Sequence, residues 1–315
     1  MLEFKEKYHF QIPASAIKKV IIDTDADNES DDPFAIVHAL LSPSLNVLGI
    51  IATHFGHQRI KESMQASYDE VERILKHMDL TDKVRLLKGC KTNLEVDTSP
   101  SFFKRYKPQE SEGVDFIIEQ ADACLKEKLY IGVLGPLTNV ASALIKRPDI
   151  AMKLVVVWNG GATYPSGGRE FNLMNDVAAA NVVFQSGAEV WHVPTDVYDM
   201  PRVTLAELQL KVEPYGKIGK YLYDKLINFL TMANENGWPM SEVFSICDET
   251  AIGALLDEQP FNAKWEPAPF ISDDMHYFSK ENCKMVKCYK NMDLRVVLED
   301  FFCKLQIQYS KKENV

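Results

Sequence analysis

The sequence has no run of about 20 apolar residues, the length that a membrane-spanning helix requires. It also lacks a cluster of Lys and Arg: 35 basic residues face 45 acidic ones, and the net charge of −10 is spread along the chain. Phosphate binding depends on clustered positive charge, so we expect no nucleic-acid partner. Because a long apolar run is missing, we also expect no membrane-spanning segment. The first ten residues, MLEFKEKYHF, are charged and lack a continuous apolar stretch, so we expect no signal peptide and a cytoplasmic protein.

Cysteine is scarce, and its distribution argues against a structural metal site or a disulfide framework. Four residues separate Cys283 from Cys288, but no second pair of Cys or His completes a zinc site. We therefore expect reduced thiols at all six positions, which are Cys90, Cys124, Cys247, Cys283, Cys288 and Cys303.

A linker rich in Pro, Gly or Ser is also missing, and the chain shows no internal repeat. With 315 residues, of which 46% are hydrophobic, the chain is long enough to bury a sizeable core. We therefore expect one α/β domain that spans residues 1–315.

Short apolar runs alternate with stretches of helical spacing. Runs typical of buried strands are KVIIDT (19–24), LNVLGIIATHF (45–55), KVRLLKG (83–89), LYIGVLG (129–135), KLVVVWNGG (153–161) and EVWHVP (189–194). Helical spacing covers residues 31–41, 59–78, 114–125, 136–148 and 176–187. This rhythm predicts a mostly parallel sheet with helices on both faces. Residues 201–256 look more helical, and short strands, including LRVVLEDFF (294–302), are expected between residues 266 and 305.

The stretch VIIDTDADNESDDPFAI, from Val20 to Ile36, places six carboxylates in the ten residues from Asp23 to Asp32. Two carboxylates about 4 Å apart repel by about 4 kcal/mol at an effective dielectric near 20. Protonation relieves this repulsion, and so does a divalent cation. Oxygen ligands without a neighbouring His or Cys favour Ca²⁺ or Mg²⁺. Most of these acidic residues also follow the predicted strand at residues 19–24, and ligands of parallel α/β sheets sit at the carboxyl ends of the strands.

Two known acidic motifs fit this stretch poorly. An EF-hand loop requires Gly where this chain has Asn28 and a bidentate Glu where it has Phe34. A phosphatase of the haloacid-dehalogenase type normally follows its aspartate pair with Thr or Val after a Gly, whereas this chain has Ala26 and Asp27. Neither motif explains the cluster.

Four stretches together resemble the inosine-uridine preferring nucleoside hydrolases, as a divergent member. They are DTDADNESDD (23–32), GVLGPLTNVASAL (132–144), NGGATYPSGGREFNLMNDVAAANVVFQSG (159–187) and CDETAIGALL (247–256), and the resemblance covers roughly residues 19–257. It implies an open, mostly parallel α/β sheet with helices on both faces and a Rossmann-like core, and an enzyme that uses Ca²⁺ to cleave the N-glycosidic bond of ribonucleosides.

The resemblance implies four metal ligands. Asp25 would bind the metal and also act as the catalytic base toward water, Asp32 would be a bidentate ligand, and Leu134 would contribute its backbone carbonyl. Asp248 would complete the set. Asp32 and Asp248 also precede helical stretches, so each has an alternative role as a helix cap.

Further residues would bind the substrate. By resemblance, Asp31 would hold a ribose hydroxyl, and Glu170 and Asn172 would bind the sugar near its 5′ end. The family places an Asn where this chain has His57, so we expect His57 at the sugar or at the leaving base. Asn159 takes the place of another missing asparagine.

The sequence departs from the family at two further points. Five residues, Ala26 to Ser30, separate Asp25 from the pair Asp31 and Asp32, whereas the family usually has three residues there. Glu29 lies within this segment, and we expect it to face the site. Cys247 stands where many relatives have a His that protonates the leaving base. With an ordinary pKa near 8.5, a thiol is a poorer acid, so Cys247 is either the leaving-group acid or an inert thiol.

We therefore expect a Ca²⁺-dependent N-ribosyl hydrolase that acts on a nucleoside or related ribosyl compound, in purine or pyrimidine salvage. Positive charge develops on the sugar in such a reaction, and a site rich in carboxylates stabilises it. A hydrolase of another glycoside and a non-catalytic, metal-stabilised sugar-binding protein are the alternatives. Soluble relatives form dimers or tetramers, so a homodimer or homotetramer is expected.

Overall fold

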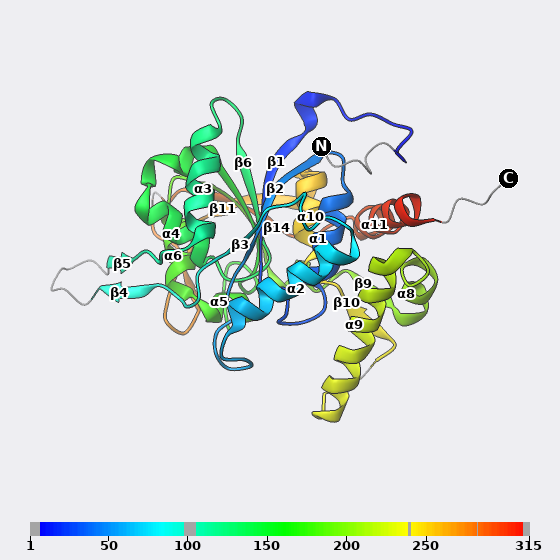
Figure 1. Cartoon of the computed structure of the whole chain (residues 1–315). Helices are drawn as coiled ribbons and strands as arrows, with labels where there is room; N and C mark the ends of the chain where they lie inside the picture. The colour runs from blue at the N-terminus through cyan, green and yellow to red at the C-terminus, as the bar shows by residue number, and fades with distance from the viewer. Residues whose placement is uncertain (1–6, 98–104, 239–240, 282, 311–315) are drawn as a thin grey trace.

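An eight-stranded sheet runs through the centre of the computed structural model, which describes residues 7–97, 105–238, 241–281 and 283–310 (Figure 1). The strand order is β11-β14-β8-β7-β6-β1-β2-β3, and every neighbouring pair is parallel except β11 and β14. The strands are β1 (Lys18–Thr24), β2 (Leu45–Ala52), β3 (Leu86–Lys88), β6 (Leu129–Val133), β7 (Leu154–Asn159), β8 (Glu189–Val193), β11 (Ala263–Pro267) and β14 (Met285–Tyr289).

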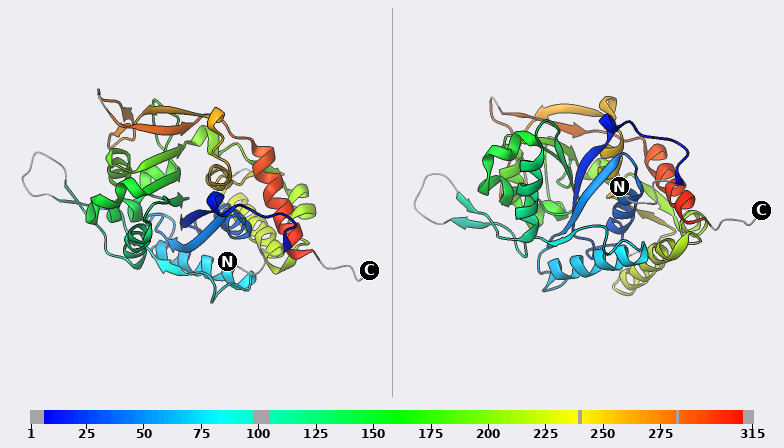
Figure 2. Two further views of the ribbon diagram at one scale, coloured as in Figure 1. Left: turned by 90° about the horizontal axis from the view of Figure 1, so that it is seen from above. Right: turned by 45° about the horizontal axis from the view of Figure 1, so that its top comes forward.

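Helices cover both faces of this sheet, as Figures 1 and 2 show from two directions. One face carries α3 (Glu112–Ala123), α4 (Thr138–Lys146) and α6 (Val177–Gln185). The other carries α1 (Asp32–Leu41), α2 (Ser63–His77), α10 (Glu249–Leu256) and α11 (Leu294–Tyr309), with α8 (Leu205–Lys211) and α9 (Gly216–Glu235) packed beyond them.

Shorter elements connect these layers. Two-stranded sheets pair β4 (Glu95–Asp97) with β5 (Arg105–Lys107), β9 (Arg202–Thr204) with β10 (Val243–Ser245), and β12 (Phe270–Ile271) with β13 (Tyr277–Phe278). The short helices are α5 (Phe171–Asn175) and α7 (Thr195–Tyr198), and 3₁₀ turns span Ala14–Ala16, Pro148–Lys153 and Pro260–Asn262.

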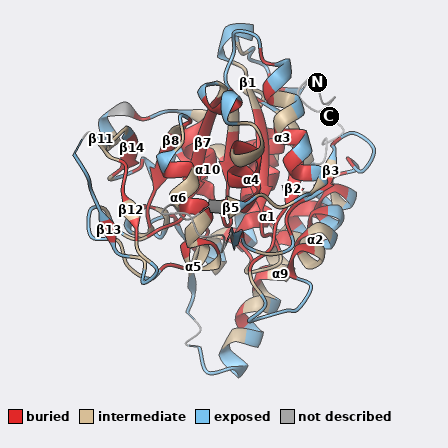
Figure 3. Cartoon of the chain, turned by 90° about the vertical axis from the view of Figure 1, so that its left-hand side faces the viewer, coloured by how far each residue is buried: buried red, intermediate tan, exposed pale blue. Residues whose placement is uncertain are grey.

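The central strands are buried along nearly their whole length (Figure 3). A parallel strand that is covered on both faces reads as a continuous apolar run, and β7 is an example because all six of its residues are buried. The predicted fold class, an open and mostly parallel α/β sheet, is confirmed. Among the described residues, no helix is both long enough and apolar enough to cross a bilayer.

One predicted element is wrong. The run LRVVLEDFF was expected as a strand, but it opens the 16-residue helix α11. Asp293 caps this helix by accepting a hydrogen bond from the Val296 amide at 3.2 Å. The buried side chains Val297, Phe301 and Leu305 recur every four residues, which is helical spacing. The β-branched and aromatic content of the run concealed this period.

Candidate active site

A cavity lies at the carboxyl ends of β1, β6 and β7, where parallel strands place their following loops together. None of the described residues that line it is Lys or Arg, and six of them are acidic. The lining residues are Asp25, Asn28, Glu29, Asp31, Asp32, Leu134, Asn159, Glu170, Phe171, Asn172, Tyr198, Cys247 and Asp248.

Three carboxylates converge at the bottom of this cavity. Asp31, Asp32 and Asp248 each offer an oxygen, and these oxygens lie within 4.8 Å of one another. Asp25 shares the cavity and is only 1% exposed, and within the described part of the chain its Oδ2 has no hydrogen-bond partner. Residues separated by more than 200 positions in sequence therefore present their carboxylates to one space.

The two helices that start here direct their N-termini toward this space. Asp32 is the first residue of α1, and Asp248 is the N-cap residue of α10, yet the Asp248 side chain makes no capping hydrogen bond. Asp31, not Asp32, occupies the N-cap position of α1, so the expectation that Asp32 caps this helix is wrong. Both carboxylates are therefore free to serve the cavity, and the positive helix N-termini favour their charged form.

Burial makes these negative charges costly. Burial and repulsion from Asp32 and Asp31 raise the pKa of Asp25 well above its ordinary value, and Asp31 and Asp248 are affected in the same way. Burial raises the pKa of Asp32 to about 6, although hydrogen bonds from Thr24 and Asp248 and the charge of Lys225 oppose the shift. A hard dication removes such repulsion, and an all-oxygen donor set is the kind that Ca²⁺ prefers.

Close packing fixes the position of Asp25. A Cβ added at Gly135, which follows β6, would lie 2.8 Å from Asp25 Oδ1, so only Gly fits beside this carboxylate. Asp23, two residues earlier, is not among the lining residues and accepts a hydrogen bond from Asn139 Nδ2 at 2.9 Å. Asn139 Oδ1 also accepts the Cys90 amide at 2.7 Å. These contacts give Asn139 a structural role.

Asparagine amides orient the groups around the carboxylates. Asn172 Nδ2 donates to the Leu134 carbonyl at 2.7 Å and to the Asn159 carbonyl at 2.9 Å. Asn159 Nδ2 donates to Asp248 Oδ1 at 3.2 Å, and its Oδ1 accepts the Thr250 hydroxyl at 3.0 Å. The Asn159 side chain thus holds Asp248 in place, a contact that sequence reasoning did not predict.

Glu170 forms the opposite wall and is held by four donors. It caps α5 by accepting the Asn172 amide at 3.0 Å and the Leu173 amide at 2.8 Å. The Gly161 amide donates to it at 2.6 Å and the Tyr198 hydroxyl at 2.8 Å. Burial and the neighbouring Glu170 raise the pKa of Tyr198, so this hydroxyl keeps its proton. Tyr198 and Phe171 add aromatic surface to a cavity that is otherwise polar.

Neither histidine of the loop after β2 lines the cavity. His57 is exposed, and its Nδ1 bonds the Lys61 carbonyl at 3.0 Å, so the structure places this predicted site residue elsewhere. His54 is buried and bonds the Thr138 hydroxyl at 2.9 Å, and burial lowers its pKa to about 4. It is a neutral, packed histidine.

Arg59 in the same loop approaches the cavity and was missed. Its guanidinium lies 4.6 Å from the centre of the Phe171 ring and donates to the Asn28 side chain at 2.6 Å and to Glu29 at 3.1 Å. Asn28 and Glu29 line the cavity, so the five-residue segment from Ala26 to Ser30 forms part of its wall. No periodic pattern signals Arg59, because the path of an irregular loop depends on its tertiary contacts.

Cys247 lines the cavity as a protonated thiol. Its Sγ lies 3.4 Å from the Ser245 hydroxyl, and burial together with the charge of Asp31 raises its pKa well above the ordinary value. A thiol of this kind can donate a hydrogen bond but is a weak acid at neutral pH.

One family model matches most of this chain. The model described as inosine-uridine preferring nucleoside hydrolase matches residues 20–310. Probable uridine nucleosidase 2 of Arabidopsis thaliana is 30% identical over 222 residues, which cover 65% of this chain and 67% of the relative. Pyrimidine-specific ribonucleoside hydrolase RihB of Escherichia coli O157:H7 is 25% identical over 252 residues, 76% of this chain and 79% of the relative.

Solved structures show the same fold. A purine-preferring ribonucleoside hydrolase from Gardnerella vaginalis superimposes with a TM-score of 0.73 at 23% identity, covering 92% of this chain and 99% of that one. A plant nucleoside hydrolase gives a TM-score of 0.73 at 23% identity, with 91% and 98% covered. The low identities fit a divergent member, and the predicted enzyme class, an N-ribosyl hydrolase, is confirmed. This chain belongs to the inosine-uridine preferring nucleoside hydrolase family.

Proposed function

We propose that the protein hydrolyses the N-glycosidic bond of a ribonucleoside and that it depends on Ca²⁺. One observation carries this proposal: four buried carboxylates share a cavity, and none of the described residues that line this cavity is Lys or Arg. Asp25, Asp32, Asp248 and the Leu134 carbonyl would hold the ion, since all four supply hard oxygen atoms. When bound, Ca²⁺ would supply positive charge that offsets these carboxylates, orients sugar hydroxyls and lowers the pKa of water.

The residues of the chain would carry the remaining chemistry. Asp25, whose Oδ2 has no hydrogen-bond partner among the described residues, would accept a proton from the attacking water. Asp31 would accept a hydrogen bond from a ribose hydroxyl. The acidic lining would stabilise the positive charge that builds on the sugar as the C–N bond breaks.

Glu170 and Asn172 would position the far end of the sugar. Their contacts within the chain keep both side chains fixed, so the cavity is preorganised and little ordering is left to the moment of binding. Cys247 would donate a hydrogen bond from its thiol to the leaving base. Tyr198 and Phe171 would pack against the ribosyl group or the base.

The names of the relatives suggest which substrates to test first. Uridine heads the panel because the Arabidopsis relative is a probable uridine nucleosidase, and cytidine follows because RihB is pyrimidine-specific. Inosine represents the purines that the Gardnerella enzyme prefers. A role in nucleoside salvage and assembly as a homodimer or homotetramer stay predictions.

The experiment is an assay of free ribose. Purified protein is incubated with each nucleoside at several pH values, in calcium and after treatment with a chelator. We expect ribose from at least one nucleoside, loss of release in chelator, and recovery when calcium is restored. Absence of cleavage of every ribosyl compound at every pH would contradict the proposal.

A further inference from the structure

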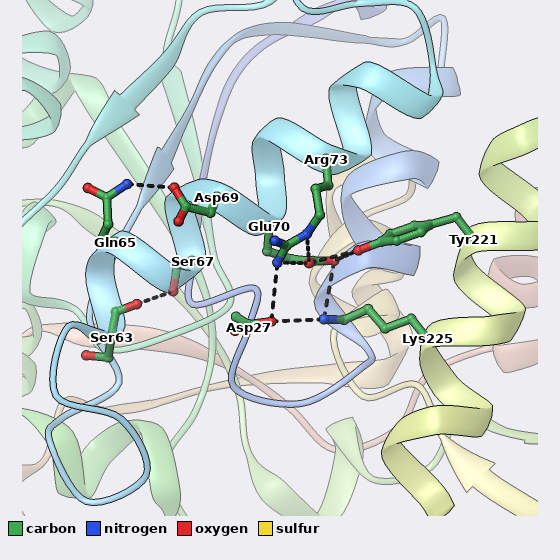
Figure 4. Close-up of polar contacts among 9 residues, drawn as sticks. All are labelled: Asp27, Ser63, Gln65, Ser67, Asp69, Glu70, Arg73, Tyr221 and Lys225. Carbon is green, nitrogen blue, oxygen red and sulfur yellow. Dashed lines mark hydrogen bonds and ion pairs between the residues drawn. The ribbon is translucent and has the colours of Figure 1, made fainter. Parts of the chain in front are cut away.

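A buried carboxylate outside the active site, Glu70 of α2, gathers three partners (Figure 4). Glu70 is 1% exposed. It accepts hydrogen bonds from Arg73 Nε at 3.0 Å and from the Tyr221 hydroxyl at 2.7 Å, and Lys225 Nζ lies 3.3 Å from its Oε1. Arg73 follows Glu70 by three residues on α2, and Lys225 follows Tyr221 by four residues on α9, so one face of each helix meets the other here.

Lys225 also reaches a third segment of the chain. Its Nζ donates to Asp27 Oδ1 at 3.1 Å, and the Arg73 guanidinium lies 3.8 Å from the same oxygen. Lys225 is well shielded, with 17% of its side chain exposed. The ammonium group therefore bridges two carboxylates, one from α2 and one from the segment 26–30.

Asp27 belongs to the segment that connects the active-site aspartates. Asp25 precedes it by two residues, and Asp31 follows it by four. The Asn28 amide closes a turn on the Asp25 carbonyl at 2.8 Å, so Asp27 lies inside a hydrogen-bonded turn that begins at Asp25. The next two residues, Asn28 and Glu29, line the cavity. Displacements of about 1 Å in supporting residues can cost about 100-fold in activity.

We propose that Lys225, held by Glu70 and Asp27, is a positioning residue that fixes the segment 26–30 and thereby the metal-binding arrangement of Asp25, Asp31 and Asp32. This inference rests on the proposed function, because it assigns Lys225 a part in building the cation site. In this way α2 and α9, which contribute no carboxylate to the cavity, control its geometry.

The sign of the effect separates positioning from simple electrostatics. The positive charge of Lys225 acts on Asp32, so its field alone opposes a bound cation. Removing that charge without disturbing the carboxylates would strengthen calcium binding. Loss of positioning weakens calcium binding instead, and the two roles predict opposite changes.

The test measures calcium affinity by isothermal titration calorimetry on the full chain. Lys225→Met removes the bridge and keeps most of the apolar stem, while Arg73 and Tyr221 still satisfy Glu70. Asp27→Asn removes the other end of the bridge. Lys220→Met is the matched control, because Lys220 is on the same helix, 54% exposed, and pairs with Glu213 at 3.2 Å.

We expect the dissociation constant for calcium to rise about tenfold in Lys225→Met and in Asp27→Asn, although the two substitutions change the local charge in opposite directions. The double variant should lose no more than either single variant, since both break one bridge. Lys220→Met should stay within twofold of the wild type.

An unchanged or tighter calcium affinity in Lys225→Met would overturn the inference, even if the melting temperature fell. Losses that add in the double variant would also overturn it, because the two side chains would then act independently. If the wild-type protein itself bound no calcium, the proposed cation dependence would fail instead, so the two failures are distinguishable.

Discussion

Two clusters of buried charge meet at the start of α10, and they differ in how their charges are compensated. Asp248 faces the cavity with Asp25, Asp31 and Asp32 and shares a repulsive environment. The next residue, Glu249, points to the other side, where its Oε2 lies 2.6 Å from His38 Nδ1.

The second cluster is balanced within the chain. His38 Nε2 lies 2.9 Å from Asp300 Oδ2, and Lys304 bonds both Asp300 and the Ser42 hydroxyl, the latter at 2.9 Å. Burial opposes the charged form of His38, but the charges of Glu249 and Asp300 outweigh it and raise its pKa. Each negative group therefore has a positive neighbour.

The two clusters therefore serve different purposes. Buried charges that are paired within the chain hold elements together, and the second cluster ties α1 and α11 to α10. Buried charges left unpaired within the chain are costly unless a ligand compensates them. Because α1 begins at Asp32 and Asp248 is the N-cap residue of α10, the balanced cluster supports the helices that form the unbalanced one.

The largest predicted effect comes from removing the base in the unbalanced cluster. Asp25→Asn should lower the turnover number by about 1,000-fold or more, because an amide cannot accept the proton from water. The calcium-free variant should fold with no loss of stability, since one repulsive charge is gone. Ribose release and the melting temperature in chelator check both statements, and an active variant would contradict the role of Asp25.

A substitution in the balanced cluster should act on stability instead. His38→Leu leaves Glu249 buried without its partner and should lower the free energy of unfolding by about 3 kcal/mol. Denaturant unfolding at saturating calcium measures the change. His276→Leu is the matched control because this histidine is exposed, and it should change stability by about 0.5 kcal/mol or less. Equal losses in both variants would contradict the comparison.

The pH dependence of stability should separate the clusters further. The raised pKa values of the cavity carboxylates, about 6 for Asp32, mean that the folded, calcium-free protein binds more protons than the unfolded chain. Its free energy of unfolding should therefore rise by about 2 kcal/mol as the pH falls from 8 to 5.

Saturating calcium keeps these carboxylates ionised and should abolish that part of the rise. The raised pKa of His38 also favours stability at low pH, but it acts with or without calcium, so the difference between the two conditions isolates the cavity. Denaturant unfolding at each pH gives both curves. Parallel curves in calcium and in chelator would show that the cavity carboxylates are not coupled to the ion.

The smallest predicted effect concerns the leaving group. Cys247→Ala should lower the turnover of a nucleoside about fivefold, since a protonated thiol with a raised pKa donates only a weak hydrogen bond. A ribosyl compound with a nitrophenolate leaving group needs no such donor and should react at the wild-type rate. Equal losses on both substrates would assign Cys247 to packing.

Much of the fold could be predicted because its strands are continuous apolar runs. The run KLVVVWNGG corresponds to β7, and the predicted helical stretch 176–187 contains α6, which Asp176 caps by accepting the Ala179 amide at 2.9 Å. The helix α11 was missed because its first nine residues carry strand-forming side chains, and tertiary packing against α1 and α10 overrides that propensity.

The candidate site likewise contains some residues that could be predicted from the sequence and others that could not. Residues that directly follow strands or start helices, such as Asp25, Asp32 and Asp248, were predictable because topology gathers these points at one edge of the sheet. His57 was misplaced and Arg59 missed because both lie in an irregular loop, where no period fixes the direction of a side chain. The bridge from Lys225 to Asp27 joins residues almost 200 positions apart and left no local pattern.

On this account, no Lys or Arg of the described residues lines the cavity, and a dication supplies the positive charge that its carboxylates need. Isothermal titration of the chelator-treated protein with calcium tests it most directly, with the double variant Asp32→Asn, Asp248→Asn as reference. We predict one calcium ion per chain for the wild type and loss of binding in the variant. Absence of binding to the wild type at millimolar calcium, or equal binding to both proteins, would contradict the claim.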